Sequence, residues 1–201
     1  MSVFLIIVGY LVGAIPFAFL LTRQFGSTDL RYVGSGNAGA ANVFRATNGS
    51  MAVIVIALDV GKGCAVVLLA KSMGVSDAVV ASVATAAVVG HVFPVWLKFS
   101  GVKGVATACG GFCVLAPQAT VLAVATFAVM VLLTRYVSLG SIVASIVLIV
   151  AVYQTGESPS IVGSAIGVGG LVLYRHRANM VRLREGSERR FGQHISCFLF
   201  T

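Results

Sequence analysis

The sequence predicts an all-α integral membrane protein with seven transmembrane helices, two of them short, and three observations lead to this prediction. Of the 201 residues, 58% are hydrophobic and only 10% are charged, whereas a soluble domain carries about a quarter charged residues. Apolar segments of membrane-spanning length recur along the chain, and the basic residues gather between them. We therefore expect one membrane-embedded domain over residues 1–201, with no separate soluble domain.

Five of the seven helices follow directly from apolar segments. Three segments, 2–22, 51–71 and 78–97, are long enough to cross a hydrocarbon core of about 30 Å. Two shorter segments lie at 137–153 and 159–174. The first segment has neither a basic start nor a small-residue cleavage site, so we interpret it as a retained span and not as a signal peptide.

The remaining stretch, 105–134, is too long for one ordinary span, and the distribution of charge decides how it crosses the membrane. A single span would give six in total and would split the basic residues between the two faces. Two short helices that turn near Ala116 and Pro117 give seven spans, and only Lys71 then lies at the opposite face, with Lys62 inside a span. The positive-inside rule favours this arrangement, with the N-terminus outside and the C-terminus in the cytoplasm.

Three polar stretches, 34–45, 90–104 and 174–179, all fall on the cytoplasmic face in this topology. They are rich in glycine, amides and cations. Glycine lets backbone N–H groups approach an anion, and Arg or Lys supplies the countercharge. We therefore expect a site for a phosphorylated substrate at the membrane surface. The net charge of +8 does not indicate nucleic acid, because the cations lie at span ends and in the tail, where they set topology and attract anionic lipid.

The first polar stretch contains the pattern Gly34-x-Gly36-x-x-Gly39, which matches the dinucleotide-binding fingerprint. We do not interpret it as a nucleotide site, because that fingerprint needs a preceding strand and here a membrane helix precedes it. A flexible connector is the alternative, but a connector does not need Arg45 and so many amides. The candidate ligands are Gly34, Ser35, Gly36, Asn37, Asn42 and Arg45.

The second polar stretch is a glycine loop that runs into a helix. Gly101, Lys103 and Gly104 form the loop, and Thr107 follows in the first turn. A lysine in such a loop commonly binds phosphate, although an interfacial lysine can also simply extend toward water. His91, near the end of the third span, could be a base, a donor to an anion or a structural residue at a helix end.

Other polar residues lie at or inside the spans. His176 and Asn179 are three residues apart and share a helix face if the seventh span continues that far. Ser141 lies at the start of the preceding span. Asp59 and Lys62, at i and i+3 inside a span, predict a structural ion pair, or else Lys62 also reaches a substrate anion. No carboxylate or Cys/His cluster in the sequence predicts a metal site.

Three motifs in these stretches resemble those of the bacterial acyl-phosphate:glycerol-3-phosphate acyltransferase family (PlsY), and the resemblance covers nearly the whole chain. The first is Ser-Gly-Asn-x-Gly-Ala-Thr-Asn followed by Arg, and the second is Gly-His-x-Phe-Pro followed by Gly-Gly-Lys-Gly-Val-Ala-Thr. The third is His-Arg-x-Asn with a downstream Gly-x-Glu. The chain departs at Ala41, where Thr is usual, and at Val102, which replaces a glycine. The matching positions are Ser35, Gly36, Asn37, Gly39, Ala40, Asn42, Arg45, Gly90, His91, Phe93, Pro94, Gly101, Lys103, Gly104, Val105, Ala106, Thr107, His176, Arg177, Asn179, Gly186 and Glu188.

The resemblance implies transfer of a fatty acyl group from an acyl phosphate to the 1-hydroxyl of glycerol 3-phosphate. The products are lysophosphatidic acid (1-acylglycerol 3-phosphate) and phosphate, and the reaction belongs to phospholipid synthesis. The implied partners are acyl phosphate, glycerol 3-phosphate and membrane lipid, with no nucleic acid and no cofactor. We expect a monomer in the bacterial cytoplasmic (inner) membrane, with its active site on the cytoplasmic face.

The resemblance also implies roles for the candidate residues. The loop from Gly101 to Gly104 would bind the phosphate of glycerol 3-phosphate, with Lys103 as countercharge. The catalytic candidates are Ser35, Arg45, Lys103, His176 and Asn179. The substrate-binding candidates are Gly34, Gly36, Asn37, Asn42, His91, Gly101, Gly104, Thr107 and Ser141.

The proton acceptor stays open at this point. An acyl phosphate is already activated, so the reaction needs no nucleophilic Cys or Ser, and no such triad is visible in the sequence. His176 or His91 could take the proton of the glycerol hydroxyl, or the phosphate of the donor could take it without a protein base. We favour the donor phosphate, because the sequence shows no evident carboxylate–His pair.

A membrane transporter for an organic phosphate is the alternative function. It would explain the glycines, the cations and the charged pair inside a span. A transporter needs polar groups near the middle of the membrane, however, and here they gather on one predicted face. A structural or assembly protein would give no reason for such dense Gly, Asn and Arg motifs.

Overall fold

The computed structural model describes residues 1–25 and 39–192, and its regular structure within these ranges is entirely helical. The elements follow one another as α1 (Ser2–Gly13), α2 (Phe17–Phe25), α3 (Ala40–Ala46), α4 (Gly49–Ser72), α5 (Asp77–Val92), a 3₁₀ turn (Val95–Leu97), α6 (Val105–Leu115), α7 (Pro117–Thr134), α8 (Val137–Gln154), α9 (Pro159–Arg175) and α10 (Arg177–Arg184).

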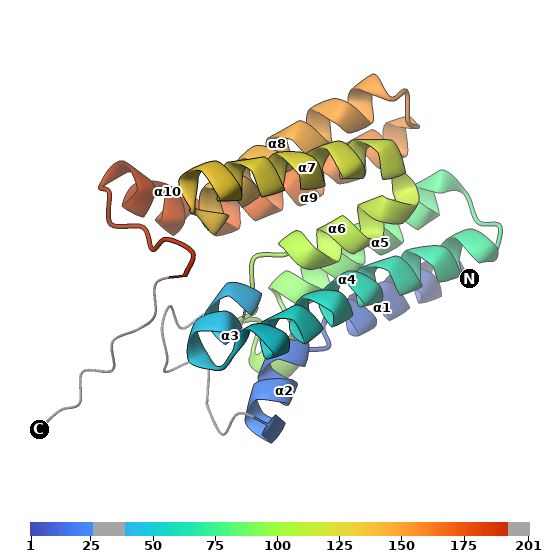
Figure 1. The fold of residues 1–201 in the computed structure, drawn as a ribbon. Helices are drawn as coiled ribbons and strands as arrows, with labels where there is room; N and C mark the ends of the chain where they lie inside the picture. The colour runs from blue at the N-terminus through green and yellow to red at the C-terminus, as the bar shows by residue number, and fades with distance from the viewer. Residues whose placement is uncertain (26–38, 193–201) are drawn as a thin grey trace, which may run out of the picture.

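The long helices run alternately up and down one bundle (Figure 1). Helices α1, α4, α5 and α6 form one group, and α7, α8 and α9 form the other. The N-terminus of α1 lies at one end of the bundle, whereas α2, α3 and α10 lie at the opposite end, which we call the α10 end. Short connections keep consecutive helices antiparallel. Gly74 and Gly156 follow α4 and α8 with φ of 66° and 74°, the left-handed conformation with which glycine ends a helix.

Five segments of the described chain are long and apolar enough to cross a membrane. They are Ser2–Phe25, Gly49–Ser72, Asp77–Leu97, Pro117–Thr134 and Val137–Gln154. Helices α6 and α9 are apolar but shorter, with 11 and 17 residues. Many large apolar side chains point outward, such as Leu132 and Leu133, as expected for surfaces that face lipid.

The predicted turn within 105–134 is confirmed, but only the first of the two helices is short, because α6 has 11 residues and α7 has 18, enough to cross a membrane. Helix α6 ends at Leu115 and α7 begins at Pro117, and Ala116 between them has φ of −143° and ψ of 72°. Proline is favoured at the first position of a helix, because its missing N–H would have no helical partner there. The turn therefore lies at Ala116 and Pro117, where the sequence predicted it.

Two predicted helices prove to be interrupted. The segment 2–22 was expected to be continuous, but α1 ends at Gly13 and α2 begins only at Phe17. Pro16 lacks an N–H and its ring clashes with the preceding turn of a helix. The segment 78–97 ends as an α-helix at Val92, before Pro94, and continues only as the 3₁₀ turn. Both interruptions lie toward the α10 end of the bundle.

Glycines let the helices of the first group approach closely. A methyl group on Gly90 would overlap the carbonyl of Tyr10 in α1, and one on Gly110 would overlap the carbonyl of Val60 in α4. Lipid tails are as apolar as the helix surfaces, so association depends on close van der Waals contact, which small residues permit. Helix α6 thereby packs closely against α4.

Candidate active site

The glycine loop before α6 is shaped by close backbone contacts. A Cβ at Gly101 would overlap the ring of Pro94 and the carbonyls of His91 and Val92. The guanidinium of Arg175 donates a hydrogen bond to the carbonyl oxygen of Gly101 at 3.0 Å. These contacts explain why position 101 needs glycine and why the loop stays close to α5 and α9.

Gly104 begins α6 as its N-terminal cap with φ of 92°, a conformation that glycine adopts without steric cost. Val102, which departs from the family motif, is buried and is not among the residues with positive φ. The loop therefore accommodates valine at 102 but requires glycine at 104. Unpaired N–H groups at a helix start favour an anion, and the half-buried Lys103 lies directly before this start.

Thr107 lies in the first turn of α6 and is fully buried. Its hydroxyl oxygen has no hydrogen-bond partner among the described residues. A buried polar group without a partner is unfavourable. A hydrogen bond between this hydroxyl and a ligand or an ordered water would therefore stabilise the bound state.

His176, between α9 and α10, is 2% exposed. Its Nδ1 lies 2.8 Å from the carbonyl oxygen of Val172. A carbonyl oxygen can only accept, so Nδ1 carries the hydrogen and Nε2 carries the lone pair. Burial, aided by the positive charge of Lys103, lowers the pKa of His176 to about 4. The imidazole is therefore neutral at pH 7, with Nε2 as an acceptor, and Lys103 lies close enough for its charge to act on it.

Asn179 belongs to a hydrogen-bonded cluster around Glu188. Its Nδ2 donates to Oε1 of Glu188 at 2.7 Å, Ser138 donates to the same oxygen at 2.8 Å, and Nε of Arg182 donates to Oε2 at 2.7 Å. Burial alone would raise the pKa of Glu188, but these hydrogen bonds outweigh it and hold the pKa below its usual range. The cluster fixes the side chain of Asn179 and joins α8 to α10.

The sequence identifies Glu188 as a motif position but predicts no role for it. The available signal was Gly186, two residues before it. Gly186 has φ of 69° and turns the chain back after α10, so that Glu188 reaches Asn179. The condition under which His176 and Asn179 would share a face of the last span is not met, because α9 ends at Arg175 and α10 begins at Arg177.

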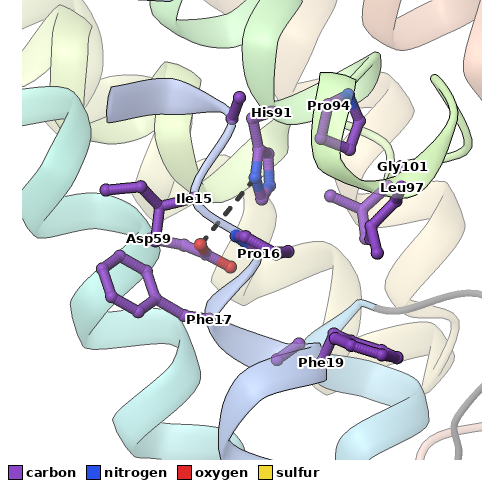
Figure 2. Close-up of a pocket in the computed structure, with 12 residues that line it drawn as sticks. Ile15, Pro16, Phe17, Phe19, Asp59, His91, Pro94, Leu97 and Gly101 are labelled. Atoms are coloured by element: carbon purple, nitrogen blue, oxygen red, sulfur yellow. Dashed lines mark ion pairs between the residues drawn. The ribbon is translucent and has the colours of Figure 1, made fainter. Parts of the chain in front are cut away.

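The predicted ion pair inside α4 is confirmed, with 2.8 Å between Nζ of Lys62 and Oδ1 of Asp59. Lys62 also lies 2.8 Å from Nδ1 of His91 and 2.8 Å from the carbonyl oxygen of Ile15. Figure 2 shows the imidazole between Asp59 and the segment that leads from Pro94 to Gly101. A carboxylate therefore does lie near a histidine, at 3.8 Å, which the sequence did not reveal.

The first polar stretch is described only in part. Gly34, Ser35, Gly36 and Asn37 lie outside the described residues. Asn42 is buried in α3, and Arg45 belongs to the same helix. Helix α3 also carries Phe44, whose ring stacks on Phe191 with 5.1 Å between centroids.

Ser141 uses its hydroxyl within its own helix, where it donates to the carbonyl oxygen of Val137 at 2.9 Å. It lies one turn after Ser138, which contacts Glu188. The described loop residues, His91, His176 and Asn179 all lie toward the α10 end of the bundle. Within the described ranges, no group of three or more His, Cys, Asp or Glu side chains could hold a metal ion.

Comparison with known proteins identifies relatives over almost the whole chain. The family model described as glycerol-3-phosphate acyltransferase matches residues 3–186. A glycerol-3-phosphate acyltransferase of Syntrophotalea carbinolica is 46% identical over 188 residues, covering 93% of this chain and 96% of the relative. A protein of the same name from Geobacter sulfurreducens is 42% identical over 184 residues, covering 92% and 94%.

Two solved structures share the fold. One is a crystal structure of PlsY, an integral membrane glycerol 3-phosphate acyltransferase, in its glycerol 3-phosphate form, with a TM-score of 0.91 and 40% identity over 95% of this chain and 96% of that one. The other is the lysophosphatidic acid form, with a TM-score of 0.88 and 38% identity over 95% of each chain. This chain therefore belongs to the glycerol-3-phosphate acyltransferase family and is an all-helical, multi-pass membrane protein.

Proposed function

We propose that this protein transfers a fatty acyl group from an acyl phosphate to the 1-hydroxyl of glycerol 3-phosphate. The products are lysophosphatidic acid and inorganic phosphate, as a step of phospholipid synthesis. Family membership supports the acyl acceptor, since the relatives are named glycerol-3-phosphate acyltransferases. The observation that carries the proposal is the constrained glycine loop at the start of α6, with Lys103 close to the neutral His176.

The loop from Gly101 to Gly104 and the first turn of α6 would bind the phosphate of glycerol 3-phosphate. Backbone N–H groups at a helix start provide donors for such an anion, and Lys103 provides the countercharge. Thr107 offers a buried hydroxyl in the same turn. The acyl phosphate would then be held by Ser35, Asn37 and Arg45 of the first polar stretch, with Gly34, Gly36 and Asn42 shaping that stretch.

The proton of the attacking hydroxyl passes to the donor phosphate in this proposal. The hydroxyl oxygen bonds to the acyl carbon, the bond from that carbon to the phosphate oxygen breaks, and the departing phosphate keeps the proton. His176, with a pKa of about 4, is a weak base at neutral pH, whereas the phosphate of the donor becomes more basic as its bond to the acyl carbon breaks. Nε2 of His176 can still accept a hydrogen bond from the hydroxyl and orient it, while the hydrogen bond from Asn179 to Glu188 links α10 to the segment that follows it.

The membrane arrangement that fits this chemistry has seven crossings. We propose that α1 and α2 together, α4, α5, α6, α7, α8 and α9 each cross, with the N-terminus outside and the α10 end in the cytoplasm of the bacterial inner membrane. The support is the alternation of helix directions and the basic residues of α9, α10 and the following segment, which gather at one end. We propose that one chain suffices, since the described candidate residues belong to a single bundle.

The test is turnover by the purified protein with glycerol 3-phosphate and either palmitoyl phosphate or palmitoyl-CoA. We expect lysophosphatidic acid and phosphate from palmitoyl phosphate alone. Lys103→Ala and Arg45→Ala should each abolish most of the rate, while Lys71→Ala, an exposed lysine near the opposite end of the bundle, should retain it. Turnover only with the CoA donor would contradict the proposed donor. No turnover with either, together with counterflow of labelled glycerol 3-phosphate in proteoliposomes, would favour transport.

A further inference from the structure

A buried lysine at the break between α1 and α2 has three acceptors at hydrogen-bond distance. Nζ of Lys62 lies 2.8 Å from Oδ1 of Asp59, 2.8 Å from the carbonyl oxygen of Ile15 and 2.8 Å from Nδ1 of His91. The Ile15 carbonyl is available because Pro16 interrupts the helix. An ammonium group has three N–H donors and no acceptor. A charged Lys62 therefore donates to the Ile15 carbonyl oxygen and to Nδ1 of His91, whereas its contact with Asp59 is an ion pair, since Oδ1 of Asp59 has no hydrogen-bond partner among the described residues.

This arrangement determines where the hydrogen of His91 lies. Because the ammonium can only donate, Nδ1 of His91 must present its lone pair. A protonated imidazolium would turn an N–H toward the ammonium, with like charges facing each other. His91 is thus a neutral ring with its hydrogen on Nε2, the reverse of His176, whose Nδ1 carries the hydrogen.

The donor Nε2–H remains available for a ligand. Among the described residues no hydrogen bond uses Nε2 of His91. The ring lines a small pocket together with Pro94, Gly101 and Val102 (Figure 2). The backbone of the same residue supports the glycine loop, since its carbonyl is one of the groups that exclude a side chain at Gly101. His91 therefore contacts Lys62 through its side chain and the glycine loop through its backbone.

We propose that Lys62 is a positioning residue that holds His91 as a neutral Nε2–H donor to a phosphate oxygen of the substrate bound at the Gly101–Gly104 loop. His91 is then a binding residue and not a base. Asp59 keeps the ammonium charged inside the membrane, where an unpaired cation would be costly. This inference rests on the proposed function, because it takes the loop as the phosphate site.

The tautomer is measured first, on the wild-type protein in lipid nanodiscs with ¹⁵N-labelled histidine. The chain has only three histidines, and the signals of His91 are those lost in His91→Gln. We expect a hydrogen-bearing Nε2 and a bare Nδ1. Lys62→Met should abolish this single tautomer, whereas Lys71→Met, at the other end of the same helix, should preserve it. A hydrogen on Nδ1 in the wild type would overturn the proposal whether or not the variants fold.

Kinetics then test the donor role. His91→Leu removes the N–H and should raise the KM for glycerol 3-phosphate about 10- to 100-fold, the usual effect of losing a hydrogen bond to a charged group, with a smaller change in kcat. His91→Gln keeps an N–H near the position of Nε2 and should restore much of this loss. Equal loss of kcat in both variants at unchanged KM would indicate a base and contradict the proposal. A wild-type protein that is inactive with palmitoyl phosphate would refute the proposed donor, while the tautomer measurement would stand independently.

Discussion

His176 and Glu188 both have lowered pKa values, but for opposite physical reasons. Burial removes the charge from His176, because the charged imidazolium loses its hydration. Three donors keep the charge on Glu188, because each hydrogen bond favours the carboxylate. At neutral pH each group therefore has one protonation state: His176 is a neutral hydrogen-bond acceptor and Glu188 is an anion.

Acidification below pH 6.5 is expected to destabilise the protein through His176. The pKa is about 4 in the folded protein and 6.5 is the ordinary value. Between these values the unfolded chain binds a proton that the folded chain does not. Each unit by which the pH falls therefore lowers the free energy of unfolding by about 1.4 kcal/mol. The contribution of His176 to the free energy of unfolding is therefore fully present above pH 6.5 and declines as the pH falls toward 4. Melting temperatures at pH 7 and pH 5 should show a smaller drop for His176→Gln than for the wild type, and equal drops would contradict this origin.

Replacement of Glu188 by glutamine is expected to lower both stability and activity. The amide cannot keep the ion pair with Arg182 and turns an N–H toward one of the three donors. An unsatisfied buried group costs about 1–3 kcal/mol. In the wild type the same stabilisation should fade only as the pH falls below 4.5, because the pKa of Glu188 is lowered from that value. The exposed Glu185 provides the matched control, and Glu185→Gln should melt like the wild type.

Local spacing explains which of these contacts could be predicted. Asp59 and Lys62 are one helical turn apart, so the sequence alone predicts their pairing. His91 joins them from another helix, 29 positions away from Lys62, and no periodicity reports such a contact. Glu188 escapes prediction for the same reason, since its partner Ser138 lies 50 positions earlier.

At the scale of the helices, one helix boundary at a proline was predicted and two were not. Pro117 was recognised as a boundary because charge counting demanded an extra turn in 105–134, and α7 does begin there. Pro16 and Pro94 lie in segments whose apolar character is continuous, and membrane helices can tolerate proline. The interruptions at 14–16 and after Val92 were therefore missed, although both carry residues next to the site.

The contact between α4 and α6 can be tested with two glycines of the same helix. A methyl group on Gly63 would overlap the carbonyl oxygen of Thr107, whereas one on Gly61 meets nothing within 4 Å. Gly63→Ala should therefore lose about 1–3 kcal/mol of stability, the usual cost of overpacking. Gly61→Ala should be neutral or slightly stabilising, since alanine has the higher helix propensity. Melting temperatures of the two variants test this prediction. Equal values would show that α4 and α6 can move apart to accommodate the methyl group without loss of stability.

Gly63→Ala should also weaken glycerol 3-phosphate binding, because Thr107 belongs to the turn that follows the glycine loop. The KM for glycerol 3-phosphate measures this effect, and Gly61→Ala again serves as the control.

At the scale of the whole molecule, the proposed seven-span arrangement predicts which loops share a face. In a variant without the four native cysteines, single cysteines at Ser72 and Glu157 should react with a membrane-impermeant maleimide in intact spheroplasts. A cysteine at Ser187 should react only in inverted vesicles. Labelling of the cysteines at positions 72 and 187 from the same side would contradict the proposal, which requires an odd number of crossings between these two positions.

Composition could predict an all-helical membrane protein because a bilayer restricts the choices. Backbone groups in hydrocarbon must be paired internally, which leaves helices or closed barrels, whereas the orientation deduced from the basic residues stays a prediction. Side-chain clusters obey no such restriction. The arrangement of Lys103, His176 and the Glu188 cluster depends on packing between α6, α8, α9 and α10, and it became visible only in three dimensions.

The stacking of Phe44 on Phe191 has a consequence for the timing of biosynthesis. Phe191 is also held by the backbone of Arg135, whose carbonyl oxygen accepts from its N–H at 2.6 Å. Helix α3, which carries Asn42 and Arg45, leaves the ribosome early, but this support for it is among the last described residues to be synthesised. A nascent chain can therefore insert its spans before the contact that holds α3 exists, and α3 gains this support only after Phe191 has been synthesised.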